Sequence, residues 1–238
     1  GDPIEHSLSP VMHNAAFRKL EIDCVYVPFR VSPSFLGDAV RGLRSQGVLG
    51  FNVTVPHKIE VVKYLHKLDE LARRVGAVNT VLNAKEGLLG YNTDGAGAVE
   101  ALKQNGVGLS NSKFVVLGAG GAARAIVFAL AEQSHQIVVL NRTLEKVQKL
   151  KRDVKQMLHV NIEANSLTRK CLARVLPKAD VLVNATSVGI ERNPKILPID
   201  EEYLTQELTV FDIVYGQSET ELLRRARQEG CKTISGIE

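Results

Sequence analysis

The sequence predicts an α/β protein in two parts, the second of which forms a doubly wound parallel sheet. Three observations lead to this prediction. Residues 113–234 alternate short apolar segments with amphipathic ones, the rhythm of successive βαβ units. Residues 1–97 instead mix helical patterns with two short strands around a turn. Hydrophobic residues make up 45% of the 238 residues and charged residues 24%, a balance typical of a globular chain with a sizeable core.

The first part, residues 1–97, is predicted to begin with a helix over 9–20. Ser9 is expected to cap this helix, with Pro10 at its first position. The apolar stretch 47–53 is expected to form a buried strand, and the turn 85–87 is expected to join two paired strands over 80–83 and 88–91. The remaining predicted elements are a strand over 24–31 and helices over 33–45, 57–65 and 70–75.

The second part, residues 98–238, shows a cleaner alternation of patterns. Its predicted helices cover 122–133, 144–157, 168–176 and 219–229. Its predicted strands cover 113–117, 136–140, 160–164, 180–184, 209–214 and 232–234. Because right-handed crossovers join parallel strands, this order predicts a doubly wound sheet. A helical pattern over 98–105 connects the two parts, so we place the boundary near residue 97.

The composition is typical of a cytoplasmic protein whose ligand is a small molecule. The net charge of +4 suits an anionic ligand, and no basic stripe indicates nucleic acid. The three cysteines lie far apart and predict neither a disulfide nor a metal site. No apolar run has the length of a membrane span, so we expect no membrane partner. We expect the chain to be a monomer or a homodimer. The Gly-Asp-Pro turn at residues 1–3 leads us to expect a strand before Gly1.

A glycine-rich motif follows the predicted strand 113–117 and opens the next helix. It is a G-x-G-x-x-A pattern with the sequence Gly118-Ala119-Gly120-Gly121-Ala122-Ala123. The first glycine allows a tight turn, the second lets the backbone approach a pyrophosphate, and the final alanine permits close packing of helix on strand. The helix N-terminus adds unpaired N–H groups and a favourable dipole. By itself the motif would also fit a flexible turn, but its strand–helix context favours a dinucleotide.

The end of the next strand favours NADP over NAD. An NAD enzyme usually has Asp or Glu there, to bind the ribose 2′-hydroxyl. This strand is followed instead by Asn141, Arg142 and Thr143, with Lys146 in the next helix. Two cations and a hydroxyl suit a 2′-phosphate. The alternative is a solvated helix start, but cations are unfavourable at a helix N-terminus.

Polar residues of the first part stand at the ends of its predicted segments. In open α/β sheets, ligands bind at the carboxyl ends of strands, so these side chains are candidates for one crevice. They are Asn52, Thr54, Lys58, Asn79 and Asp94, together with Ser7 and Ser9 before the first helix.

These residues belong to seven ordered blocks that together resemble the signature series of the shikimate dehydrogenase family. The blocks are HSLSP (6–10), GFNVTVPHK (50–58), GAVNT (76–80), YNTDG (91–95), GAGGAAR (118–124), NRT (141–143) and NATSVG (184–189). The resemblance covers essentially the whole chain. It implies a Rossmann-like second domain and the NADP-dependent, reversible reduction of 3-dehydroshikimate to shikimate in aromatic amino-acid biosynthesis.

The resemblance also implies a role for individual residues. The implied catalytic residues are Lys58 and its carboxylate partner Asp94. The implied substrate ligands are Ser7, Ser9, Asn52, Thr54, Asn79, Asp94 and Tyr215. The implied cofactor ligands are Gly118, Ala119, Gly120, Gly121, Ala122, Asn141, Arg142, Thr143, Lys146, Thr186, Ser187, Ile213 and Gly236.

Chemistry supports the Lys58–Asp94 assignment. Oxidation of a secondary alcohol needs a proton acceptor at the hydroxyl while a hydride leaves the same carbon. A lysine–aspartate pair can accept that proton and orient the hydroxyl, and we treat the two groups as one coupled unit. The alternative is that Lys58 is a surface helix residue and Asp94 a helix cap.

The chain departs from the family pattern at two places. Glu221 follows Thr220 where the family commonly has proline, a change of little expected consequence at a first helical turn. Beyond Gly236 the resemblance implies a further substrate-binding glutamine and a last helix. Three alternatives remain: a quinate/shikimate enzyme that accepts NAD, a non-catalytic dinucleotide-binding protein, and part of a longer chain that also carries a dehydroquinase domain.

Overall fold

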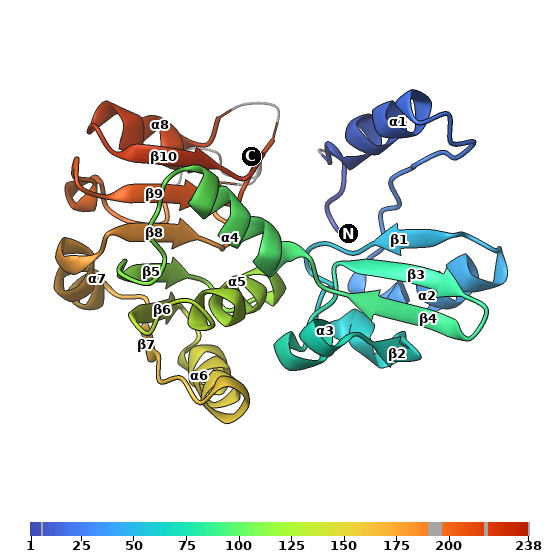
Figure 1. Ribbon diagram of the computed structural model, residues 1–238, viewed down its shortest axis with the longest axis horizontal. Helices are drawn as coiled ribbons and strands as arrows, with labels where there is room; N and C mark the ends of the chain where they lie inside the picture. Colours follow the sequence, from blue (N-terminus) through green and yellow to red (C-terminus); the bar gives the residue numbers. More distant parts are fainter. Residues whose placement is uncertain (6, 190–196, 217–218, 238) are drawn as a thin grey trace.

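The structure of the chain is a computed structural model that describes residues 1–5, 7–189, 197–216 and 219–237. Two sheets lie side by side, with helices α4 (Asp94–Gln104) and α5 (Gly121–Ala131) between them (Figure 1). The smaller sheet has four strands in the order β1-β3-β4-β2, and the larger has six in the order β10-β9-β8-β5-β6-β7. Within these described residues, no helix is both long and apolar enough to span a membrane.

The smaller sheet is built on a β-hairpin. Strands β3 (Thr80–Ala84) and β4 (Gly87–Tyr91) pair antiparallel around the turn that the sequence predicts. Strand β1 (Gly50–Asn52) pairs antiparallel with β3, and β2 (Lys67–Leu68), which was not predicted, pairs parallel with β4. The helices of this part are α1 (Ser9–Lys19), α2 (Leu36–Ser45) and α3 (Glu70–Val75), with 3₁₀ turns η1 (Pro33–Phe35) and η2 (Glu60–Tyr64).

Several predictions in this part are wrong. Residues 24–31 form no strand: the backbone N–H and C=O of Tyr26 bond to the side chain of Asn14 instead of to a neighbouring strand. Strand β1 is not buried, because β3 is its sole partner among the described strands and Gly50 and Asn52 face solvent. Ser9 does not cap α1, because the chain is already helical at Leu8 and no side-chain cap bond forms.

The segment 57–65 is tighter than expected. The helical pattern there predicts an α-helix, but the structure has the 3₁₀ turn η2 over Glu60–Tyr64. The preceding residues form turns, in which the His57 N–H donates to Thr54 O over 2.9 Å. This turn places Lys58 just outside the helical segment, where its backbone O accepts from the Val78 N–H over 2.7 Å.

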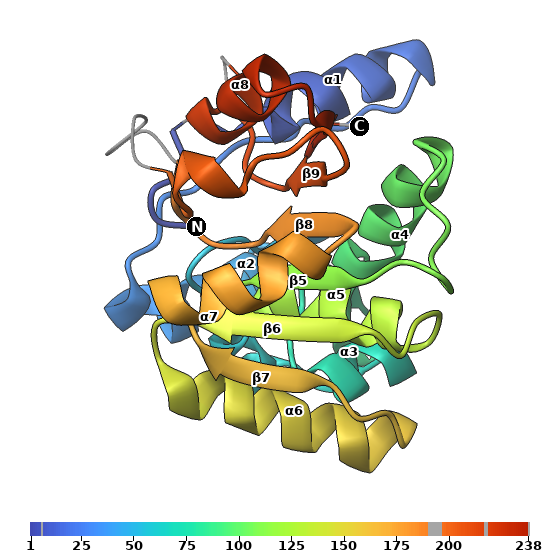
Figure 2. The ribbon, with the colours of Figure 1, turned by 90° about the vertical axis from the view of Figure 1, so that its left-hand side faces the viewer.

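The larger sheet is wholly parallel and doubly wound, as predicted. Its strands are β5 (Phe114–Leu117), β6 (Ile137–Asn141), β7 (Glu163–Ser166), β8 (Val181–Asn184), β9 (Thr209–Asp212) and β10 (Lys232–Ser235). Figure 2 shows the order from β9 to β7. The chain winds outward from β5 to β7 and then crosses to β8, so the topological switch point lies between β5 and β8.

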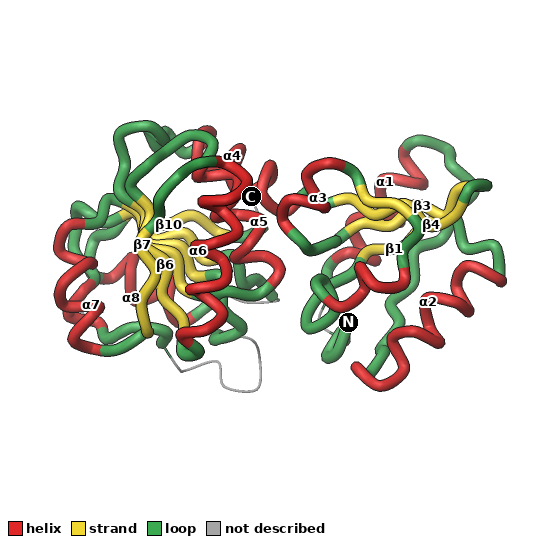
Figure 3. Tube along the Cα trace, turned by 90° about the horizontal axis from the view of Figure 1, so that it is seen from below, coloured by secondary structure: helices red, strands yellow, loops and turns green. Residues whose placement is uncertain are grey.

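Helices cover both faces of this sheet (Figure 3). On one face, α4, α5 and α6 (Leu144–Leu158) bury a cluster that includes Phe114, Phe128 and Leu150. On the other face, α7 (Arg169–Val175) and α8 (Glu221–Gln228) bury a cluster that includes Leu117 and Leu222. The 3₁₀ turns of this part are η3 (Leu176–Lys178) and η4 (Glu201–Tyr203). The alternating apolar residues of β5 supply both clusters, which holds the switch point in a rigid core.

Candidate active site

Lys58 and Asp94 form an ion pair between the two sheets. Lys58 lies in the turn before η2, and Asp94 is the first residue of α4. The Lys58 Nζ lies 2.7 Å from Asp94 Oδ2. The exposed fractions of the two side chains are 14% and 19%, so this is no surface salt bridge. The N-cap of α4 is Thr93, which rules out the alternative that Asp94 serves as the cap.

Asparagines fix the second oxygen and the backbone of Asp94. The Asn79 Nδ2 donates to Asp94 Oδ1 over 2.8 Å, so both carboxylate oxygens have partners. The side chain of Asn92, which is buried, accepts from the Asp94 N–H over 3.1 Å and donates to Ala77 O over 2.9 Å. These bonds hold the carboxylate in one orientation toward Lys58. Asn92 carries no role in the predictions, although it stands in the same YNTDG block.

Asn52 and Ser7 line one cavity of about 140 Å³, together with Tyr26 and mostly apolar side chains. The Asn52 Nδ2 donates to Thr80 Oγ1 over 3.2 Å, and its Oδ1 accepts from the Tyr26 hydroxyl over 3.0 Å. Tyr26 stacks on His13, with ring centroids 4.5 Å apart. Burial raises the pKa of the Tyr26 hydroxyl, and the side chain of Ser9 opposes that shift through a hydrogen bond.

Tyr26 is therefore a polar group of this site that sequence reasoning missed. Tyr26 lies in an apolar, extended segment, and the neighbouring sequence does not distinguish it from a tyrosine of the hydrophobic core. Tyr215, from the second part of the chain, adds a small electrostatic rise to the Tyr26 pKa, after burial and the Ser9 hydrogen bond. His57 is buried, and its Nε2 lies 2.6 Å from Val31 O, which is a structural contact. His6 lies outside the described residues.

The glycine-rich motif has the geometry that a pyrophosphate needs. Gly118 has φ +113°, and a Cβ there would lie 2.6 Å from Ala185 O at the end of β8, so glycine is required. Gly120 faces open space, since a Cβ there would meet nothing within 4 Å. It is also the N-cap of α5, whose first N–H groups have no intrahelical acceptors. These residues fit a dinucleotide phosphate.

The residues after β6 form an exposed cationic corner. Asn141 ends β6, and its Nδ2 donates to Thr143 O over 3.1 Å. Arg142 and Lys146 are exposed at the start of α6, and within the described parts of the chain neither forms a hydrogen bond or ion pair. No acid stands at the tip of β6. The corner therefore suits a phosphate monoester rather than a ribose hydroxyl pair.

A buried polar cluster at the ends of β8 and β9 was not predicted. Asp212 is fully buried; its Oδ2 accepts from the Thr220 hydroxyl over 2.7 Å and its Oδ1 from Asn184 Nδ2 over 2.9 Å. Burial raises the pKa of Asp212 to about 6, and hydrogen bonds from Thr220, Val214 and Asn184 limit the shift. The Thr186 hydroxyl donates to Asn184 Oδ1 over 2.7 Å, which ties the predicted cofactor ligand into the cluster.

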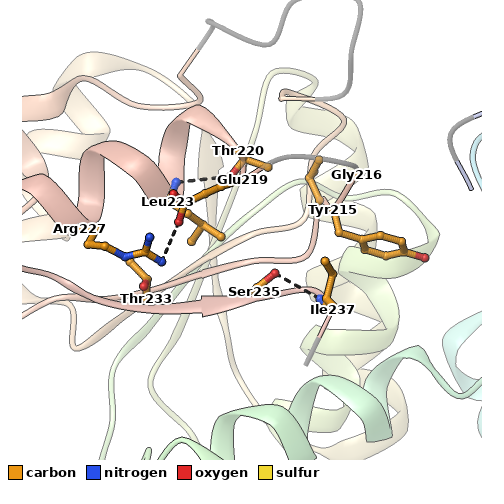
Figure 4. Close-up of a pocket in the computed structure, with 10 residues that line it drawn as sticks. Tyr215, Gly216, Glu219, Thr220, Leu223, Arg227, Thr233, Ser235 and Ile237 are labelled. Atoms are coloured by element: carbon orange, nitrogen blue, oxygen red, sulfur yellow. Dashed lines mark hydrogen bonds and ion pairs between the residues drawn. The ribbon is translucent and has the colours of Figure 1, made fainter. Parts of the chain in front are cut away.

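The remaining predicted cofactor residues line the same edge of the sheet. A Cβ at Gly236 would lie 2.6 Å from Ile213 O, so these two residues are packed together, and Ser187 is exposed beside Thr186. Tyr215 lies at the rim of a cavity of about 250 Å³ (Figure 4). The Glu219–Arg227 ion pair, 2.7 Å long, lies away from Tyr215 in this cavity.

Family models match both parts of the chain. Residues 1–81 match the shikimate dehydrogenase substrate binding domain, and residues 100–214 match shikimate / quinate 5-dehydrogenase. A shikimate dehydrogenase (NADP(+)) of Methanosarcina mazei is 48% identical over 240 residues, which cover 100% of this chain and 85% of the relative. The chain belongs to the shikimate dehydrogenase family.

Solved structures of shikimate dehydrogenases have the same fold. One in complex with NADP⁺ superposes with a TM-score of 0.88 at 39% identity, covering 99% of this chain and 82% of the other. The Thermus thermophilus enzyme in complex with NADP(H) and shikimate gives a TM-score of 0.83 at 35% identity, covering 99% and 84%. These likenesses confirm the predicted family and the predicted doubly wound fold.

Proposed function

We propose that this chain catalyses the NADP-dependent, reversible reduction of 3-dehydroshikimate to shikimate, a step of aromatic amino-acid biosynthesis. The observation that carries the proposal is the Lys58–Asp94 ion pair, held 2.7 Å apart beside the glycine-rich motif. Relatives named NADP-dependent shikimate dehydrogenases cover the whole chain at 40–48% identity. The same reaction, run in reverse, oxidises one ring hydroxyl.

In this proposal, Lys58 and Asp94 handle the proton. Reduction adds a hydride to the carbonyl carbon and a proton to its oxygen, and oxidation removes both. The Lys58 ammonium hydrogen-bonds the reacting oxygen and donates a proton as that oxygen gains negative charge. Asp94, whose oxygens are occupied by Lys58 and Asn79, orients the ammonium and stabilises its charge.

The other polar groups of the first part bind the substrate. Shikimate has one carboxylate and three hydroxyls, which call for several directed donors and acceptors. Ser7 and Asn52 share a cavity, and Ser9 lies within hydrogen-bonding reach of Tyr26. The proposed substrate ligands are Ser7, Ser9, Asn52, Thr54, Asn79, Asp94 and Tyr215. A site that pairs each hydroxyl discriminates strongly against a substrate with a different set.

The second part binds the dinucleotide. When bound, NADP(H) supplies or accepts the hydride. Residues 118–122 hold its pyrophosphate, and Asn141, Arg142, Thr143 and Lys146 hold the 2′-phosphate. Thr186, Ser187, Ile213 and Gly236 contact the ribose and nicotinamide. The open face of Gly120 and the unpaired cations after β6 support this division of roles.

We further infer a division into a substrate domain (1–97) and a cofactor domain (98–238). Each part has its own sheet, and the boundary falls within α4. A helix that spans the boundary gives the two domains a stiff connection, so closure over the substrate takes place by rotation near its ends. We infer that the protein is located in the cytoplasm. We also infer that it is a monomer or a homodimer, and light scattering of the purified chain distinguishes these two states.

The deciding experiment is a spectrophotometric assay of NADPH formation from shikimate. Turnover with shikimate and NADP, and at least tenfold lower kcat/KM with NAD, is the expected result. Quinate is the control substrate, since the second family model also names quinate. If kcat/KM with quinate and NAD equals or exceeds that with shikimate and NADP, the chain is a quinate dehydrogenase and this proposal is wrong. NADPH binding without any turnover would leave only a dinucleotide-binding role.

A further inference from the structure

One face of α5 contacts Lys58 and Gly95, the residue that follows Asp94. The face contains Gly121, the first residue of α5, and Ala125, one turn later. Residues at i and i+4 of a helix lie one above the other, so the two form a continuous surface. Helix α4 lies along α5 (Figures 1 and 2), which brings the residue after Asp94 onto this surface.

Gly121 touches the stem of Lys58. A Cβ at Gly121 would lie 2.6 Å from Lys58 Cβ and 3.4 Å from Lys58 Cδ. Real Cβ atoms essentially never come that close, so a side chain at 121 would displace the lysine. The lysine cannot yield easily, because its Cβ is next to the backbone and its O is bonded to the Val78 N–H over 2.7 Å.

Gly95 makes the matching contact for Asp94. A Cβ at Gly95 would lie 2.5 Å from Ala125 O and 3.0 Å from Ala129 Cβ. The first neighbour is a backbone atom of α5, which has no freedom to rotate away. A side chain at 95 would therefore push the start of α4, and Asp94 with it, off α5.

We propose that Gly121 and Gly95 are positioning residues for the acid–base pair. The pyrophosphate motif accounts for Gly118 and Gly120, but a Cβ at Gly121 would point at Lys58 rather than into the open space at Gly120. Gly121 thus sets the position of the proton donor, and Gly95 sets that of its carboxylate partner. In this proposal, helix α5 binds the cofactor phosphates at its N-terminus and positions the Lys58–Asp94 pair along its side. The same helix therefore aligns the hydride donor with the proton donor. This inference rests on the proposed function.

The test begins with Gly121→Ala, Gly95→Ala and the control Gly97→Ala. Gly97 is in the same helix as Gly95, but a Cβ there would meet nothing within 4 Å. We expect kcat to fall about tenfold to hundredfold in G121A and in G95A, the size that a displacement of about 1 Å produces. We expect G97A to keep the wild-type kcat. NADPH affinity, measured by fluorescence, is expected to stay within about threefold in G95A and G97A, because neither residue belongs to the proposed cofactor site.

A double-mutant cycle with Lys58→Ala separates positioning from general damage. If Gly121 acts through the lysine, adding G121A to K58A lowers kcat no further. Equal fold-losses in the two backgrounds would overturn the proposal, as would wild-type turnover in G121A and G95A. If G121A does not fold, the same cycle is run with G95A and Asp94→Asn. Lysine ¹⁵Nζ NMR gives a readout without turnover: the Lys58 resonance, identified by its loss in K58A, should shift in G121A and not in G97A.

The outcomes also separate this inference from the proposed function. If K58A itself turns over like the wild type, the catalytic assignment fails, whatever G121A does. If K58A is inactive while G121A and G95A are normal, the assignment stands and the positioning role fails.

Discussion

Lys58 and Asp94 are 36 positions apart, and their charged atoms are 2.7 Å apart. Because the proposed proton transfer runs through this contact, Lys58→Ala is expected to lower kcat about 10² to 10⁴-fold. The KM for shikimate is expected to change little, since the lysine acts mainly as the oxygen gains charge. Steady-state kinetics with shikimate and NADP measure both parameters. Lys63→Ala, which removes an exposed lysine of η2, is the control. Near-wild-type kcat in K58A would remove Lys58 from the mechanism.

Asp212 makes a residue-scale prediction about pH. Burial raises its pKa to about 6, above its ordinary value, so the folded state holds the proton more tightly than the unfolded chain. The stability that the folded state gains from holding this Asp212 proton is therefore fully present below about pH 4. It is lost as the pH rises through about 6. Asp212→Asn has no charge to bury, and it retains an oxygen for Asn184 Nδ2.

We expect the wild type to lose about 2 to 3 kcal/mol of unfolding free energy, relative to D212N, between pH 4 and pH 7. Urea unfolding at several pH values measures the difference, with Asp200→Asn as a control at a more exposed carboxylate. The same slope of stability against pH in the wild type and D212N would show that Asp212 keeps an ordinary pKa.

At the scale of elements, the junction of β6 and α6 is the proposed site of cofactor choice. Arg142 is exposed there without a protein partner in the described chain, so its charge is available to a 2′-phosphate. Arg142→Ala is expected to raise the KM for NADP about tenfold to hundredfold, the value of one or two charge-assisted hydrogen bonds, with no change for NAD. The control is Arg152→Ala, an exposed arginine later in the same helix. An equal effect on both cofactors would indicate a loss of fold at this corner instead.

Helices whose ends are marked by nearby capping residues could be predicted from the sequence. Segments whose conformation depends on a contact with a residue distant in the sequence could not. Helix α3 has its predicted bounds, because Asp69 caps it through the Ala72 N–H and Gly76 ends it in the left-handed conformation. Glu221, which stands where the family commonly has proline, opens α8 and pairs with Arg224 and Arg225. The segment 24–31 has a strand-like pattern, but its backbone bonds to a side chain, which no local pattern reveals.

At the scale of the whole molecule, Arg124 joins three elements. It is a buried residue of α5; its Nε donates to Val75 O at the end of α3 over 2.7 Å, and its guanidinium bonds Asp153 of α6 over 2.9 Å. Arg124→Ala leaves that carbonyl and carboxylate without their donor. We expect a loss of about 2 to 4 kcal/mol in the free energy of unfolding. Guanidinium chloride unfolding measures it, and Arg152→Ala again serves as the control. A loss below about 0.5 kcal/mol, the usual range for surface sites, would mean that the contact adds little.

By itself, the sequence determined the order of the βαβ units, the glycine-rich turn after β5 and the cationic residues after β6. Each depends on residues within a few positions of one another, where periodicity, glycine and the helix dipole act directly. The resemblance implied that Lys58 pairs with Asp94, but only the tertiary structure decided their 2.7 Å distance, the burial of Asp212 and the contact of Gly121 with the lysine. Residues 28 or more positions apart meet in the contacts Lys58–Asp94, Asn184–Asp212 and Lys58–Gly121, through the packing of α4 on α5 and the pairing of β8 with β9. Local sequence patterns do not encode such distances, because packing between elements sets them.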